Sequence, residues 1–142
     1  MKINKVSTRY IEIVDSTLRD GEQTSGVSFV PHEKLMMARM LLRDVNVDRL
    51  EVASARVSEG ERQAVSMICR YAKQIDRLDS IEVLGFCDGH KSADWIAECG
   101  GKVMNLLSKG SLKHCQLQLK KSPEDHFQNI IDEASYAHSK GI

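Results

Sequence analysis

Residues 10–26 read YIEIVDSTLRDGEQTSG, a short apolar run followed at once by a loop rich in charges, hydroxyls and glycine. The apolar positions from Ile11 to Val14 predict a β-strand that ends where the polar residues begin. In α/β proteins, ligand chemistry lies at the carboxyl ends of the strands. The stretch therefore predicts a strand that delivers the polar side chains of Asp15 to Gly26 to a site at its carboxyl end.

The same arrangement recurs along the chain. Three further short apolar runs, bounded by polar or turn residues, predict strands over 50–53, 81–86 and 103–107. Helical patterns with one apolar face follow the four runs, over 31–45, 65–75, 95–99 and 123–141, and Ile142 stands where a fifth strand would begin. The order strand then helix is thus repeated four times.

This alternation predicts an α/β fold, because strands joined through helices pair in parallel by right-handed crossovers. The pattern alone leaves two closures open. One is an open doubly wound sheet, and the other is part of a (β/α)8 barrel, which takes about 250 residues. Four βα units would make half of such a barrel.

Composition excludes several classes of protein. The 142 residues contain 20 basic and 20 acidic side chains without a basic block, which argues against binding to nucleic acid or to an anionic membrane surface. The four cysteines are widely spaced and contain no C-x-x-C pair, so we expect reduced thiols rather than a zinc site or disulfides. Residues 1–10 lack the apolar run of a signal peptide, and no segment reaches the roughly 20 apolar residues of a membrane helix. We therefore expect a cytoplasmic protein.

The first loop holds the pair Arg19 and Asp20, followed by Gly21. An arginine can donate two parallel hydrogen bonds to a carbonyl or carboxylate and stays charged at neutral pH. A neighbouring carboxylate is a ligand for hard metal ions. Composition alone leaves a second interpretation open, a solvated loop in which both residues pair with neighbours.

Glu51 places a carboxylate inside the apolar run Leu50-Glu51-Val52. In a barrel it points either into the lumen near the mouth or into a salt bridge beneath a helix. Buried acids are seldom left unpaired, which favours an arginine or metal partner, and Arg19 is one option. The loops after the third and fourth strands contain neither G-x-x-x-x-G-K-[ST] nor G-x-G-x-x-G, so a phosphate site there is only weakly indicated.

The nine residues from Asp15 to Gln23 resemble the D-x-T-L-R-D-G-x-Q signature of a family of acyl-CoA-condensing and lyase enzymes on TIM barrels. That family includes the 2-isopropylmalate, homocitrate and citramalate synthases. The likeness continues through 26–29, 46–49, 53–61, 83–89, 105–107 and 109–112, and so covers essentially the whole chain. Within the family the segments are most similar to the (R)-citramalate synthases, with 2-isopropylmalate synthase as the alternative.

The resemblance implies that residues 1–142 form the first four βα units of a (β/α)8 TIM barrel, the N-terminal half of a catalytic domain. It implies a homodimeric acyltransferase that condenses acetyl-CoA, the co-substrate, with a 2-oxo acid, here pyruvate, to give citramalate. It also implies a divalent metal, Mg²⁺, Mn²⁺ or Zn²⁺, with Asp20 as a ligand. Arg19 would be the catalytic arginine at the ketone oxygen, Gln23 a supporting partner, and Glu51 an acid beside the substrate.

The resemblance also assigns specificity. In citramalate synthases, leucines at the positions of Leu84 and Leu107 wall a small apolar pocket around the methyl group of pyruvate, which excludes the isopropyl group of 2-oxoisovalerate. Isopropylmalate synthases commonly carry a histidine on the fourth strand, where this chain has Asn105. Without the resemblance, plain core packing is the preferred interpretation of both leucines.

The family completes its metal site with an H-x-H pair from a later strand and adds a glutamate after the fifth, and these 142 residues contain neither. We therefore expect the chain alone to be inactive. A different class of function also stays open. A half-barrel leaves two open sheet edges, and pairing with a second copy would make it a non-catalytic oligomerisation module.

Overall fold

The computed structural model describes residues 10–142, so the N-terminal part of the predicted domain and the stretch used to judge a signal peptide lie outside it. Four parallel strands form one sheet in the order β1-β2-β3-β4, which is also their order along the chain. The strands are β1 Val14–Asp15, β2 Arg49–Ser54, β3 Ile81–Phe86 and β4 Val103–Leu107. A doubly wound sheet reverses its order at a switch point, whereas a barrel adds each strand beside the last. The observed order selects the barrel.

The first strand is shorter than predicted. Only Val14 and Asp15 pair with β2, opposite Arg49 and Leu50. Ile13 still lies beside the start of β2, because its carbonyl accepts hydrogen bonds from the backbone N–H groups of Asp48 and Arg49 at 3.0 and 3.1 Å. The predicted strand over Ile11 to Val14 is therefore corrected at its N-terminal end, since β2 offers no further residues to pair with.

The helices follow the strands in the predicted order, but the second and third begin at Glu59 and Lys91, earlier than the predicted starts at 65 and 95. The helices are α1 Pro31–Met40, α2 Glu59–Gln74, α3 Lys91–Glu98 and α4 Pro123–Ser139, with short turns η1 Gly21–Gln23, η3 Leu78–Ser80 and the π-helical segments η2 Leu41–Val45 and η4 His114–Leu119. Ser58 and Ser122 cap α2 and α4, each accepting a hydrogen bond from the backbone N–H three residues later. Proline at the first position of α1 and of α4 supports the same starts.

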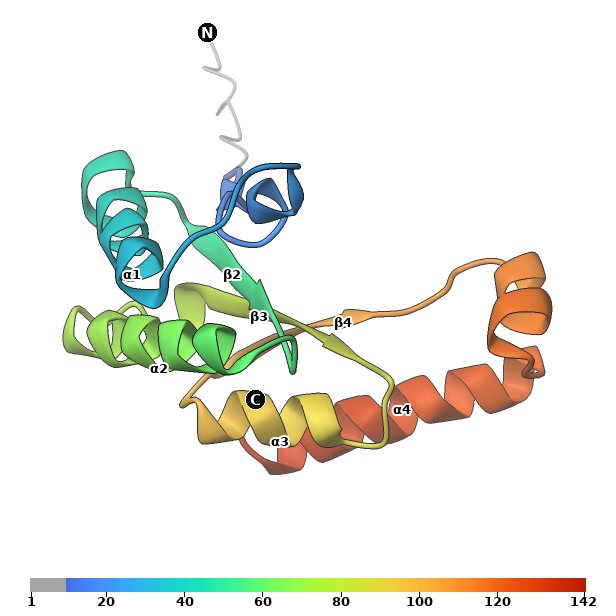
Figure 1. Ribbon diagram of the computed structural model, residues 1–142. Helices are drawn as coiled ribbons and strands as arrows, with labels where there is room; N and C mark the ends of the chain where they lie inside the picture. The colour runs from blue at the N-terminus through green and yellow to red at the C-terminus, as the bar shows by residue number, and fades with distance from the viewer. Residues whose placement is uncertain (1–9) are drawn as a thin grey trace, which may run out of the picture.

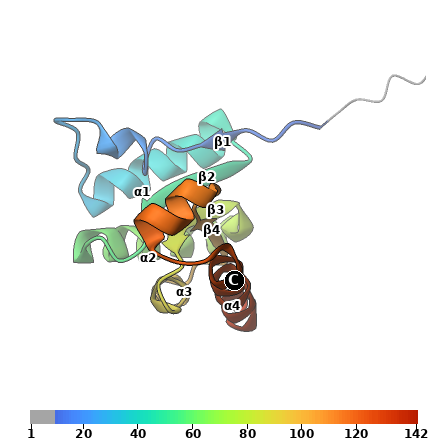
Figure 2. The same ribbon diagram turned by 90° about the vertical axis from the view of Figure 1, so that its right-hand side faces the viewer.

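All four long helices lie on one side of the sheet and follow it in an arc (Figures 1 and 2). The apolar core fills the space between them, and its strand residues alternate with polar ones. On β3, Ile81 and Val83 are fully buried against the helices, while Glu82 and Leu84 point to the opposite face. That opposite face corresponds to the lumen of a barrel. The prediction of an α/β fold that forms part of a TIM barrel is thus confirmed.

Two smaller findings bear on the sequence analysis. All four cysteines, at positions 69, 87, 99 and 115, are free thiols. No helix within residues 10–142 is long and apolar enough to cross a membrane.

Candidate active site

The loop after β1 begins with a tight turn that separates the directions of its side chains. The carbonyl of Ser16 accepts hydrogen bonds from the backbone N–H groups of Arg19, Asp20 and Gly21 at 2.8–3.2 Å. Inside this turn Leu18 is fully buried in the core. The buried leucine fixes the turn, so that Arg19 points toward the sheet and Asp20 toward solvent.

Arg19 is paired with the glutamate that the sequence singles out. Its Nε donates to Glu51 Oε2 at 2.7 Å, and its Nη2 lies 2.7 Å from the same oxygen. Ser16 Oγ donates to Oε2 at 2.7 Å and Asn105 Nδ2 donates to Oε1 at 3.1 Å. Burial raises the pKa of Glu51, but the hydrogen bonds from Ser16, Asn105 and Arg19 outweigh it, so the pKa lies below its ordinary value. Glu51 is thus a buried, ionised anchor for the guanidinium.

Asp20 lies at the mouth of the site. Its Oδ1 accepts from Arg19 Nη1 at 2.6 Å, and its side chain is 66% exposed. Its second oxygen takes part in no hydrogen bond among residues 10–142, so it can bind a cation. A carboxylate of this kind fits one ligand position of a hard divalent metal. The described part of the chain groups no three His, Cys, Asp or Glu side chains as a complete metal site.

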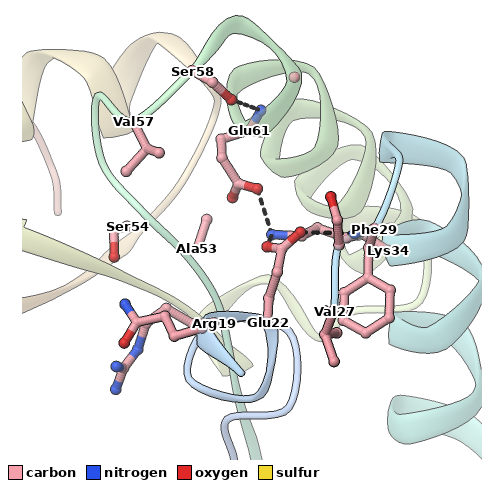
Figure 3. A pocket seen from close by; sticks show the side chains of 13 residues that line it. Arg19, Glu22, Val27, Phe29, Lys34, Ala53, Ser54, Val57, Ser58 and Glu61 are labelled. Carbon is pink, nitrogen blue, oxygen red and sulfur yellow. Dashed lines mark hydrogen bonds and ion pairs between the residues drawn. The ribbon is translucent and has the colours of Figure 1, made fainter. Parts of the chain in front are cut away.

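A pocket of about 400 Å³ opens beside Arg19, between the first loop and the β2–α2 connection (Figure 3). This volume lies within the range of small-molecule sites. Gln23, Ser54 and Val57 line it together with Arg19, and an ionic cluster of Glu22, Lys34 and Glu61 forms one side. Of the residues predicted for the site, Arg19 and Gln23 line this pocket, and Glu51 contacts it through Arg19.

Lys34 is a site feature that sequence reasoning missed. Its side chain is only 1% exposed, and its Nζ lies 2.6 Å from Glu22 Oε2 and 2.6 Å from Glu61 Oε1. Burial raises the pKa of Glu22, but the hydrogen bonds from Lys34 and from the N–H of Phe29 outweigh it, so this pKa lies below its ordinary value. At Glu61 the effect of burial is larger than that of Lys34, so the pKa lies above its ordinary value. The sequence does indicate its burial, because Lys34 precedes Ala38 and Leu42 at intervals of four residues and so lies on the same buried face of the helix.

Glu82 is the second missed residue. It is 2% exposed, lies directly beside Glu51 in the sheet and pairs with Arg49. Asn105 Nδ2 donates to Glu82 Oε2 at 2.6 Å as well as to Glu51, so one amide bridges two buried carboxylates. The signal was the same as for Glu51, a charge inside the apolar run Ile81-Glu82-Val83.

The two predicted specificity residues lie apart from the Arg19 pocket. Leu84 is in register with Asn105 on the neighbouring strand, so it stands next to the Glu51 network on the lumen face. Leu107 ends β4, is 44% exposed, and lines a separate pocket of about 270 Å³ with Phe86 and His126. The described residues therefore place one leucine near the carboxylates and the other closer to the mouth.

Comparison with known proteins agrees with the geometry. The HMGL-like family model matches residues 10–142. The chain is 30% identical to the (R)-citramalate synthase CimA of Methanocaldococcus jannaschii, over 93% of this chain and 26% of that protein. It is 35% identical to the 2-isopropylmalate synthase of the same organism, over 93% of this chain and 24% of that protein. It is 36% identical to the homocitrate synthase AksA of Methanopyrus kandleri, over 92% of this chain and 31% of that protein.

The chain spans about a quarter to a third of the length of these relatives. All three relatives are synthases by name, and the predicted family resemblance is confirmed over almost the whole chain. The chain belongs to the HMGL-like family, and its four parallel strands with helices on one side are part of that family's TIM barrel.

Proposed function

We propose that this chain supplies part of the active site of an acyltransferase that condenses acetyl-CoA with a 2-oxo acid, and that pyruvate is the oxo acid, giving citramalate. The observation that carries the proposal is the position of Arg19 at the carboxyl end of β1, held by Glu51 and next to the exposed Asp20. The relatives named as citramalate, 2-isopropylmalate and homocitrate synthases support the reaction class. In this proposal residues 1–142 are the N-terminal half of the catalytic barrel.

The hydrogen-bond count supports a role for Arg19 at a ketone oxygen. A guanidinium has five N–H groups, and the contacts to Glu51 and Asp20 engage three of its nitrogens through one N–H each. The remaining N–H groups on Nη1 and Nη2 can donate to an oxygen that gains negative charge when a carbanion attacks the carbonyl. Because Glu51 already fixes the guanidinium, little reorganisation is needed at that moment.

Asp20 would hold a divalent metal, Mg²⁺, Mn²⁺ or Zn²⁺, through its free carboxylate oxygen. Such a metal, when bound, polarises the carbonyl of the oxo acid as a Lewis acid. Gln23 lines the pocket beside Arg19, so its side-chain amide can reach polar groups of a substrate placed there. Since the described residues provide one such carboxylate at the mouth, we expect the 142 residues alone to show no turnover.

The substrate preference rests on Leu84 and Leu107. We propose that these side chains limit the space around the alkyl group of the oxo acid, which favours the methyl group of pyruvate over a branched chain. The alternative within the family is 2-isopropylmalate synthase, which is supported by the 35% identity to a relative of that name. One extra or missing methylene in an apolar pocket changes discrimination by roughly 10- to 200-fold, so the two substrates are separable by assay.

The test is CoA release, followed with a thiol reagent, by the chain and by a longer polypeptide that carries it. Each is given acetyl-CoA, one of the three metals, and either pyruvate or 2-oxoisovalerate. We expect turnover with pyruvate in the longer polypeptide and a loss of about 100-fold or more for Arg19→Lys, because lysine keeps the charge but loses the fork. A preference for 2-oxoisovalerate would replace pyruvate in the proposal, and normal turnover by Arg19→Lys would remove Arg19 from it.

Self-association is the second candidate function, and the edge before β1 favours it. Four apolar side chains there are at least half exposed, at Tyr10, Ile11, Ile13 and Val14. Apolar chain at an open sheet edge is a common surface for pairing with another copy. Light scattering of the purified chain at several concentrations tests this. A mass of one chain throughout would exclude the oligomerisation module, and the same measurement on the longer polypeptide tests the homodimer.

A further inference from the structure

The most buried charged side chain in the described chain is Lys34, and nothing in the condensation chemistry above uses it. A buried ammonium loses its hydration, so it is tolerated only where fixed partners replace the water. Lys34 has three such partners. Its Nζ lies 2.6 Å from Glu22 Oε2, 2.6 Å from Glu61 Oε1 and 3.3 Å from the carbonyl of Val52.

These three partners come from three different segments, and Figure 3 shows Glu22 and Glu61 on either side of the Lys34 ammonium. Glu22 belongs to the loop after β1, Val52 to the carboxyl half of β2, and Glu61 to the first turn of α2. Lys34 itself stands in the first turn of α1. One ammonium therefore joins the loop that carries Arg19 to the two βα units beside it.

The partner in the loop is close to the residues of the proposed chemistry. Glu22 lies inside η1, where the N–H of Gln23 donates to the Asp20 carbonyl at 3.1 Å. Its other carboxylate oxygen accepts from the N–H of Phe29 at 2.9 Å, so the same side chain also closes the far end of the loop. The position of Glu22 is thus coupled to that of Arg19 through this short hydrogen-bonded turn.

We propose that Lys34 is a positioning residue, whose buried ammonium holds the loop from Ser16 to Val30 in place and thereby fixes Arg19 against Glu51. Its value for catalysis rests on the proposed function, but the position of Arg19 can be measured without any reaction. An apolar side chain would fill the same space, yet it would hold no defined contact with Glu22. The ion cluster therefore sets the geometry of the loop rather than adding stability alone.

The experiment uses the Arg19 Nε–H group as a reporter in the chain without substrate. This proton is donated to Glu51 at 2.7 Å, so its ¹H–¹⁵N resonance is expected to be shifted and its exchange with water slow. Three variants are compared with the unmodified chain: Lys34→Met, Glu22→Gln and, as a matched control, Lys140→Met. Lys140 is an exposed lysine at the C-cap of α4 that also pairs with a carboxylate, that of Asp94 at 3.2 Å.

In Lys34→Met we expect exchange of the Arg19 Nε–H and of the backbone amides of 16–29 to become at least about tenfold faster, while amides of β3 stay unchanged. Glu22→Gln leaves Lys34 paired with Glu61, so we expect faster exchange in the loop and not in α2. This variant also provides the test if Lys34→Met does not fold. Lys140→Met should leave the Arg19 resonance in place.

Two results would overturn the proposal. One is an unmoved Arg19 resonance with normal loop protection in Glu22→Gln, and the other is an equal rise in exchange over the loop, α2 and β3 in Lys34→Met. The latter would give Lys34 a purely structural role. A chain whose Arg19 resonance responds as expected, but whose longer form releases no CoA, would refute the proposed function and leave this inference standing.

Discussion

Two loops at the carboxyl edge of the sheet are built in opposite ways. The loop after β1, from Ser16 to Val30, buries Leu18 completely and is bonded through Glu22 to the buried Lys34. The segment after β4, from Ser108 to Ser122, exposes Leu112 and Leu117 by 58% and 70%. In Figure 1 this second segment projects away from the sheet, at the far end of β4.

The difference teaches which loop can hold chemistry in place. The second segment has one buried side chain, Cys115, whose Sγ contacts the carbonyls of Lys121 and Ser122 within the same segment. Those contacts close the segment on itself, and its start is held to α4 rather than to the sheet, by the hydrogen bond between His126 Nε2 and the carbonyl of Lys109 at 3.0 Å. The first loop is fixed to β2, α1 and α2, so a guanidinium placed on it keeps its position when a substrate arrives.

The largest expected effect comes from the two leucines that mark this contrast. Leu18→Ala should lower the free energy of unfolding by about 3 kcal/mol, because it opens a cavity in the core. Leu117→Ala removes a side chain that is 70% exposed and should cost less than about 0.5 kcal/mol. Urea unfolding of both variants measures the difference. Similar costs would mean that the segment after β4 is packed far better than its exposure indicates.

A smaller effect is expected from the ion pairs. Glu51→Gln keeps the shape of the side chain but leaves Arg19 and Ser16 facing a neutral amide, and should lower the free energy of unfolding by about 2 kcal/mol. Its control is Glu98→Gln, because Glu98 pairs with Arg62 on the surface, with both side chains about half exposed. That loss should be about 0 to 1 kcal/mol. Equal losses from the two substitutions would show that the Arg19–Glu51 pair is no better ordered than a surface pair.

The sequence predicted the elements better than their ends. The third and fourth strands match, because each apolar run faces a full-length neighbour. The first strand is shorter than its apolar run, since β2 begins only at Arg49, opposite Val14. Before that point Asp48 takes over, accepting from the N–H of Ile13 at 2.8 Å and from the hydroxyl of Tyr10. An apolar pattern in the sequence indicates which residues suit a strand, but it does not indicate whether a neighbouring strand is there to pair with them.

The part of the candidate site that the sequence predicted is the part where burying an unpaired carboxylate would be costly. A glutamate inside an apolar strand needs an arginine or metal partner, and Arg19 at the end of the first strand was one option. Lys34 escaped because a lysine in a helix is ordinarily exposed, and its partner Glu61 lies 27 residues away. Glu82 escaped because its partners, Arg49 and Asn105, come from the two neighbouring strands. The sequence shows that such a charge is placed at a buried position, whereas the tertiary fold decides which residues are its partners.

The smallest effect is expected in the pH dependence of stability, where the buried Glu51 and the partly buried Glu61 act in opposite directions. The pKa of Glu51 lies below 4.5, its value in the unfolded chain, so its contribution is complete above pH 4.5 and is lost as the pH falls through the folded value. Burial raises the pKa of Glu61 above 4.5, so its contribution is complete below that pH and is lost as the pH rises through the folded value.

Glu51→Gln should therefore flatten the acid side of the stability profile, and Glu61→Gln should flatten the decline on the other side of pH 4.5. Urea unfolding at intervals between pH 3 and about 7 measures both slopes, and a parallel shift of the whole profile in either variant would contradict the assigned direction. Opposite changes would establish that the loop is held by an ionised Glu51 on the sheet side and by a carboxylate with weakened acidity on the α2 side.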